Sequence, residues 1–241
     1  MTIKLPNKLG VHALVWVGGW SHAECREAIS NTVEAGYDLI EIPALDPSLI
    51  DTEHTLATLK EFGIKAACSM GLSFDADINS EDSAVVAKGE AKLMAALDVV
   101  AGIEGDYLGG VLFSALGKYL HPATTKSRAN SIASLKRLAI AAQSKGITIG
   151  LEPVNRYESN LINTIDQAVE MIKEIGEPNV KVHIDIYHMN IEEQDLASPI
   201  INNAEYIGYV HIGASHRGGL GTGNVDFEEL FGALAKINYK G

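Results

Sequence analysis

Three side chains that can bind a metal ion recur at regular intervals in the second half of the chain. Glu152, Asp185 and His211 each end a short apolar segment, and the intervals between them are 33 and 26 residues. One strand-and-helix unit of an eightfold α/β barrel takes roughly 31 residues, so the spacing predicts that the three residues end neighbouring strands and meet at one mouth. Two carboxylates and an imidazole are a ligand set for a divalent cation, with Mn²⁺ preferred and Mg²⁺ or Co²⁺ as alternatives.

Each of these residues also has a structural interpretation when it is taken alone. Glu152 would be an ion-pair partner, Asp185 the N-cap of a helix, and His211 a hydrogen-bonded histidine of the core. Their combination at this spacing favours the metal site. Glu41 stands at another predicted strand end, and the pattern assigns it no role.

Two further groups near these positions are predicted to be structural. His183 precedes Asp185 by two residues and therefore shares its inward direction, but it lies deeper and is expected to be a buried structural histidine. Glu192 and Glu193 are expected to form a solvated helix start, because acidic side chains suit the positive end of a helix dipole.

Short apolar segments alternate with amphipathic helices along the chain. One helix is predicted to begin at a Ser21–Glu24 capping box and a later one at the Thr164–Gln167 pair. Gly63 and Gly176 follow predicted helices, as is typical where the chain must adopt a positive φ. The apolar segments are hydrophobic throughout, which fits strands buried on both faces of a parallel sheet. They span residues 9–16, 38–44, 64–70, 107–113, 147–153, 180–186 and 206–212.

Alternating strands and helices predict an α/β fold, and 241 residues favour a single (β/α)8 TIM-barrel domain over 1–241. A G-x-G-x-x-G turn does not follow the first strand, which weighs against a Rossmann domain. Only seven strands can be assigned, because a helix around Leu230 is followed by INYKG and the sequence then ends. Since a seven-stranded barrel would leave an open edge, we expect the eighth strand to be missing from this chain.

The amino-acid composition limits the kinds of molecule that this protein is expected to bind. With 46% hydrophobic residues and a net charge of −12, the chain fits a globular domain and lacks the basic surface that nucleic acid requires. It has no apolar run long enough to span a membrane, and its opening residues, MTIKLPNKLG, lack the apolar region of a secretory signal. Two cysteines are too few for a disulfide framework and predict a reducing cytoplasm. The expected partner is a small neutral or metal-bound molecule.

The segments LEPVNRYESN, HIDIYHMNIEE and VHIGASHRGGLGTG resemble the ketose 3-epimerase family, and GVHALVW extends the resemblance toward the start of the chain. This family includes D-tagatose, D-allulose (D-psicose) and L-ribulose 3-epimerases within the xylose isomerase-like TIM-barrel superfamily. The resemblance implies an enzyme that inverts C3 of a free ketose through an enediolate. It assigns Glu152, Asp185 and His211 to the metal, and it places a fourth ligand, a glutamate, on the eighth strand past residue 241. That glutamate and Glu152 would form the acid–base pair.

The resemblance also implies the sugar contacts and the assembly. Glu158, His188 and Arg217 match positions that hold the O1–O2 end of the ketose, and a homodimer or homotetramer is expected. Trp16 and Phe113 are candidates for an apolar wall of the pocket, although residues at strand ends also serve as core. Trp16 is the preferred wall residue.

Other interpretations remain open at this point. An aldose–ketose isomerase or a sugar lyase of the same superfamily would share the barrel and the ligands, and a non-catalytic sugar-binding barrel would need no chemistry. Ala214 and Gly219 depart from the family pattern, in which glutamate and tyrosine are common. An endonuclease is less favoured, because it would need a basic face for DNA.

Overall fold

Seven strands form one parallel sheet in the computed structural model, which describes residues 7–241. The strands follow one another across the sheet in their order along the chain, and each neighbouring pair is parallel. They are β1 (Gly10–His12), β2 (Leu39–Pro43), β3 (Lys65–Leu72), β4 (Tyr107–Ala115), β5 (Thr148–Leu151), β6 (Val180–Asp185) and β7 (Ile207–His211).

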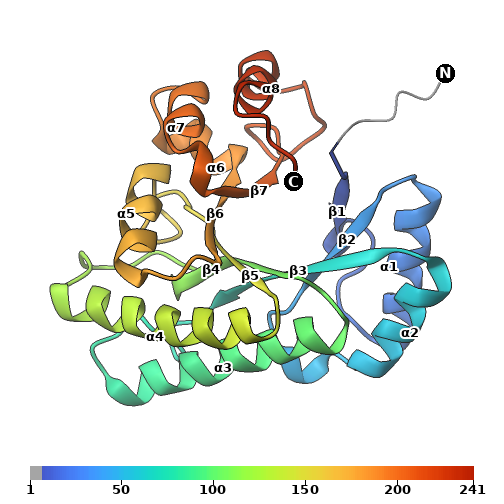
Figure 1. Ribbon diagram of the computed structural model, residues 1–241, viewed down its shortest axis with the longest axis horizontal. Coiled ribbons are helices and arrows are strands. Elements are labelled where there is room, and N and C mark those ends of the chain that lie inside the picture. The colour runs from blue at the N-terminus through green and yellow to red at the C-terminus, as the bar shows by residue number, and fades with distance from the viewer. Residues whose placement is uncertain (1–6) are drawn as a thin grey trace.

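The sheet is curved, with the connecting helices around its outer side, and β1 and β7 are its two edges (Figure 1). This arrangement confirms the predicted TIM-barrel class, and the expected eighth strand is not among the strands of residues 7–241. The helices are α1 (His22–Glu34), α2 (Thr52–Phe62), α3 (Ser83–Gly102), α4 (Thr125–Ser144), α5 (Ile165–Ile175), α6 (Ile186–Glu192), α7 (Ala197–Asn202) and α8 (Phe227–Lys236).

The helix ends form where the local sequence predicts them. Capping boxes begin α1 at Ser21 and α5 at Thr164, and Gly63 and Gly176 end α2 and α5 in the left-handed conformation. Helix α5 buries its isoleucines against the sheet, which orients the loop that precedes β6. In the described range, no helix has both the length and the apolar character needed to cross a membrane. The first part of the opening segment, for which no secretory signal is expected, lies outside the described residues.

The first strand is shorter than predicted. β1 ends at His12, and a 3₁₀ turn, Ala13–Val15, carries the chain to Trp16. The turn begins because Nδ1 of His12 accepts a hydrogen bond from the backbone N–H of Leu14, at 3.2 Å. The imidazole of His12 is thereby fixed at the end of the strand, while Trp16 lies beyond it.

Aromatic side chains fill the interior below the strand ends. The rings of Tyr107 and Tyr209 stack with their centroids 4.4 Å apart, and His183 lies edge-on to Tyr209 at 4.7 Å. Gly150 makes room for this packing, because a Cβ there would lie 1.8 Å from the hydroxyl oxygen of Tyr107. His183 is completely buried, which confirms its predicted burial, and this layer forms a floor beneath the residues at the mouth.

Candidate functional site

The carboxyl ends of five strands bring acidic and imidazole side chains to one edge of the sheet. Strands β1, β6 and β7 end at His12, Asp185 and His211. Glu41 is the middle residue of β2, and Glu152 directly follows β5. Because parallel strands end on the same side, residues far apart in sequence meet there. The three predicted metal ligands are thus brought together, and His12 and Glu41 join them.

The imidazole of His211 lies among three carboxylates. Its Nδ1 is 3.6 Å from Oε1 of Glu152 and 3.8 Å from Oδ2 of Asp185, and its Nε2 is 2.8 Å from Oε2 of Glu41. Burial alone would lower the pKa of His211, but the charge of Glu41 and the hydrogen-bonding carboxylates hold it well above its usual value.

The pKa values of the carboxylates of Glu41 and Asp185 are shifted downward, opposite to that of His211. Burial would raise the pKa of Glu41, but the charge and the hydrogen bond of His211, with smaller contributions from His183 and His12, outweigh it and hold the pKa below its usual value. The pKa of Asp185 is lowered as well, because the hydrogen bond from His211 and the charge of His188 overcome its burial. With no metal bound, a protonated His211 therefore balances a cluster of buried negative charge.

The donor atoms of the cluster fit a divalent cation. Glu152, Asp185 and His188 offer ligand atoms that all lie within 4.8 Å of one another, and Glu152, His183 and His211 form a second set of the same kind. The first set, with two carboxylates and one imidazole, suits ions such as Mn²⁺, and neighbouring carboxylates with little exposure to water favour a bound positive charge. The donor set is therefore consistent with a divalent metal.

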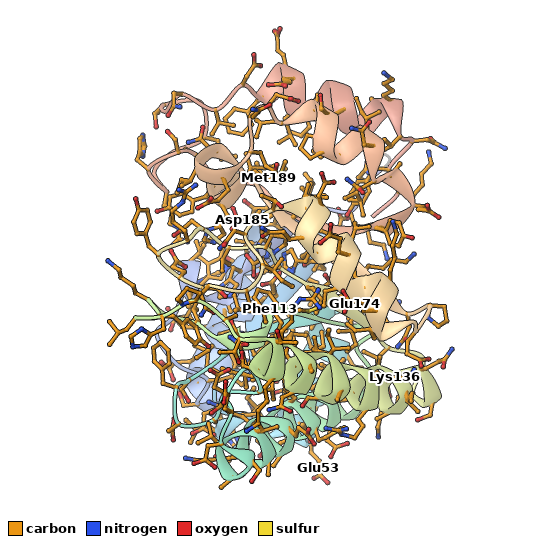
Figure 2. The ribbon with its side chains drawn as sticks, turned by 90° about the vertical axis from the view of Figure 1, so that its left-hand side faces the viewer. Glu53, Phe113, Lys136, Glu174, Asp185 and Met189 are labelled. Carbon is orange, nitrogen blue, oxygen red and sulfur yellow. The ribbon has the colours of Figure 1, made fainter. Side chains whose placement is uncertain are left out.

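Asp185 is a helix N-cap, one of the roles considered for it, and its other oxygen faces the cluster. Its Oδ1 accepts a hydrogen bond from the backbone N–H of Tyr187 at 2.7 Å, so it is the N-cap of α6. Its Oδ2 faces His211. Figure 2 labels Asp185 near Met189 at α6, whereas Glu53 projects from the outer surface. The cap holds the carboxylate at the strand end and leaves the second oxygen free to face the cluster.

His188 is oriented by the loop after β5. Its Nδ1 accepts a hydrogen bond from the backbone N–H of Asn155 at 3.1 Å, and the side-chain amide nitrogen of Asn155 lies 2.9 Å from the same atom. A backbone N–H can only donate, so the ring proton of neutral His188 is assigned to Nε2. This buried Nε2–H fits a donor to a bound ligand better than a metal ligand.

The two other residues predicted to contact the sugar are also neighbours. Oε1 of Glu158 accepts a hydrogen bond from the Asn155 side chain at 3.0 Å and lies 4.0 Å from Nη2 of Arg217. Glu158, His188 and Arg217 are therefore linked around Asn155 and the start of α6. Asn155 carries no charge and no metal-ligating group, so the sequence pattern alone did not single it out.

The two aromatic wall candidates differ in exposure. Trp16 is half-buried, and its Nε1–H donates to Oγ1 of Thr32 in α1 at 3.0 Å. Phe113 has no exposed surface, and Figure 2 shows it in the interior. A direct contact between the Phe113 ring and a ligand would require neighbouring side chains to move, so its place in the wall stays a prediction.

The expectation that Glu192 is solvated at a helix start is wrong. Glu192 is the last residue of α6, and its side chain is only 5% exposed. It accepts hydrogen bonds from the backbone N–H and the guanidinium of Arg156, both at 2.7 Å. Glu193 is half-buried and accepts from the backbone N–H of Ile165. Glu192 therefore ties the loop after β5 to the end of α6, and Glu193 ties the start of α5 to the same place.

Comparisons with known proteins agree with this geometry. The sequence model of the xylose isomerase-like TIM barrel family matches residues 29–241. The L-ribulose 3-epimerase of Methylomonas sp. (strain DH-1) is 50% identical over 98% of this chain and 83% of its own length. The ketose 3-epimerase of Arthrobacter globiformis is 47% identical over 97% of this chain and 81% of its own length.

The solved structures include a D-allulose 3-epimerase from Methylomonas sp. in complex with D-allulose. It superimposes with a TM-score of 0.96 at 49% identity, and the match covers 98% of this chain and 82% of that one. A structure of an L-ribulose 3-epimerase gives a TM-score of 0.94 at 40% identity over 97% of this chain and 79% of that one.

Proposed function

The chain belongs to the xylose isomerase-like TIM barrel family and, within it, to the ketose 3-epimerases, and on this basis we propose that it inverts C3 of a free ketose. The substrate pairs are D-allulose and D-fructose, D-tagatose and D-sorbose, or L-ribulose and L-xylulose. Relatives that share about half of this sequence are named for L-ribulose and for ketoses in general, and a solved relative holds D-allulose. The observation that carries the proposal is the convergence of Glu152, Asp185 and His211 at one mouth.

In the proposed reaction Glu152 exchanges the proton on C3. This carboxylate is 9% exposed, so little water competes with a substrate for its oxygens. A positioned acid or base contributes roughly 10²–10⁴-fold to the rate of a proton transfer. Inversion also needs a second group on the opposite face of the sugar, and the family resemblance assigns it to the glutamate of the eighth strand.

The other residues hold the ketose and stabilise the enediolate that forms when C3 loses its proton. Nε2–H of His188 and the guanidinium of Arg217 donate to the oxygens of the O1–O2 end, and Glu158 accepts from a hydroxyl. A preorganised donor to a developing oxyanion is worth about 3 kcal/mol. Trp16 and Phe113 are proposed for the apolar wall.

A divalent metal would be held by Glu152, Asp185 and His211, and Mn²⁺ is the proposed ion. When bound, such an ion acts as a Lewis acid that lowers the energy of negative charge on a carbonyl oxygen. Both cysteines are buried and free, which fits the cytoplasmic location included in this proposal.

Incubation of the Mn²⁺-loaded protein, in a form that includes the eighth strand, with each ketose in D₂O tests the reaction. We expect the C3 epimer to appear with deuterium at C3, as read by NMR. An aldose product labelled at its C2 would instead identify an aldose–ketose isomerase. Ketoses that bind but keep their C3 proton would identify a sugar-binding protein and contradict the proposal.

A further inference from the structure

Glu41 is a buried carboxylate to which the proposed function gives no task. It lies in the middle of β2, and its side chain is only 4% exposed. A buried carboxylate is costly unless charged or hydrogen-bonding partners compensate for it. Its Oε2 lies 2.8 Å from Nε2 of His211, and the second oxygen has no hydrogen bond from any of residues 7–241.

The two ring nitrogens of His211 face different partners. Nε2 points to Glu41, whereas Nδ1 points between Glu152 and Asp185. An ionised carboxylate can only accept hydrogen bonds, so the nitrogen that faces Glu41 must carry a proton. The lone pair available to a metal is then on Nδ1, on the side of the two other carboxylates.

We propose that Glu41 is a positioning residue that holds His211 in the Nε2–H tautomer and directs Nδ1 toward the metal between Glu152 and Asp185. Histidines that bind metals commonly donate their other ring N–H to a carboxylate, and this partner fixes both the tautomer and the ring orientation. The inference rests on the metal site of the proposed function. It concerns the binding of the metal, and its tests do not require that a ketose be epimerised.

His12 completes the arrangement from the other side of Glu41. Because Nδ1 of His12 accepts from the backbone N–H of Leu14, the proton of its neutral ring is on Nε2. That Nε2 lies 3.7 Å from Oε1 of Glu41 and 3.4 Å from Oγ of Ser69. His12 thus presents an N–H toward the carboxylate oxygen that His211 does not use, which keeps Oε2 turned to His211.

Calorimetric titration with Mn²⁺ tests the role of Glu41 without any ketose. We expect Glu41→Gln to weaken Mn²⁺ binding by about 10- to 100-fold, the range typical of such partners. In the His211→Ala background the same substitution should change the affinity by less than about 2-fold, because residues that act through one another are not additive. The matched control is Glu90→Gln, since Glu90 is a partly buried carboxylate in α3 that pairs with Arg137 far from the mouth. Unchanged affinity in Glu41→Gln, or equal losses in both backgrounds, would overturn the proposal.

A second measurement reads the tautomer in the unaltered protein and needs a variant only to assign the signal. In the Mg²⁺-saturated protein with ¹⁵N-labelled histidines, one of the 8 histidine signals disappears in His211→Ala and is thereby assigned. We expect this ring to carry its proton on Nε2. A proton on Nδ1 would contradict the proposal even in a protein that epimerises ketoses, whereas a protein without epimerase activity can still show the expected tautomer.

Discussion

The guanidinium carbon of Arg217 lies 4.0 Å from the centroid of the Tyr187 ring. Arg217 is exposed and adopts a positive φ of 56°, which is uncommon for a residue other than glycine. Tyr187 is in the first turn of α6, next to Asp185 and His188. This contact ties the loop after β7 to the helix that carries the cluster.

Tyr187→Leu is expected to raise the KM for the ketose with a smaller change in kcat. A cation–π contact is worth about 0.5–2 kcal/mol, which corresponds to an increase of up to about 30-fold. Tyr187→Phe keeps the aromatic face and is the matched control, with a KM close to that of the parent protein. Steady-state kinetics of both variants test this prediction. An equal rise in KM in Tyr187→Leu and Tyr187→Phe would exclude a role of the ring face.

Asn155→Ala is expected to lower kcat/KM by roughly 10-fold. The amide of Asn155 contacts both Nδ1 of His188 and Oε1 of Glu158, and each lost side-chain hydrogen bond costs about 1 kcal/mol. The backbone N–H of Asn155 still reaches His188, so the loss should stay moderate. Kinetics alongside a thermal melt separate a local effect from unfolding, and parent-like kcat/KM would show that the amide does not support these two residues.

The strands and the convergence of Glu152, Asp185 and His211 were predictable because their signals are local and repetitive. Continuous apolar segments mark the strands, and Glu152, Asp185 and His211 each occupy the same place in one repeating unit. The contribution of His12 was not predictable, since it depends on a 3₁₀ turn that ends β1 early.

Glu192 and Phe113 show a second limit of the sequence pattern. The burial of Glu192 depends on Arg156, which approaches from the loop after another strand. The complete burial of Phe113 depends on how neighbouring elements cover the end of β4. In both cases the local sequence is compatible with a buried or an exposed side chain. Contacts with other elements of the fold decide which of the two occurs.

Phe113 and Trp16 should respond differently to truncation. Phe113→Ala is expected to reduce the free energy of unfolding by about 3–5 kcal/mol, because it leaves a cavity in the core. Trp16→Leu should cost less stability and raise KM more, since Trp16 is half-buried and is proposed for the pocket wall. Denaturant unfolding and ketose kinetics of each variant provide the comparison. A large rise in KM for the conservative Phe113→Leu would place Phe113 in the pocket wall.

Mn²⁺ affinity is expected to rise with pH through the neutral range. The pKa of His211 is held well above its usual value by the surrounding carboxylates, so the ring is protonated near pH 7 when no metal is bound. Nδ1 must lose its proton to bind a metal, and binding therefore releases about one proton below the raised pKa. The affinity should increase by up to about tenfold per pH unit and level off above that pKa. Calorimetry in two buffers of different ionisation enthalpy counts the protons, and a count of zero would show that His211 is not a ligand.

Chelation of the metal with EDTA should abolish turnover while the protein stays folded. A protonated His211 offsets part of the negative charge of Glu41, Glu152 and Asp185 when no cation is present, so removal of the metal does not leave these carboxylates without a positive partner. Because a ligand that binds only the native state stabilises it by about 2.7 kcal/mol at a hundredfold excess over Kd, the metal-free protein should melt at a lower temperature. Circular dichroism with thermal melts follows the fold, and addition of Mn²⁺ should restore both the melting temperature and the turnover. Full activity after exhaustive chelation would remove the metal from the mechanism, whereas unfolding on chelation would show that His211 cannot replace the cation.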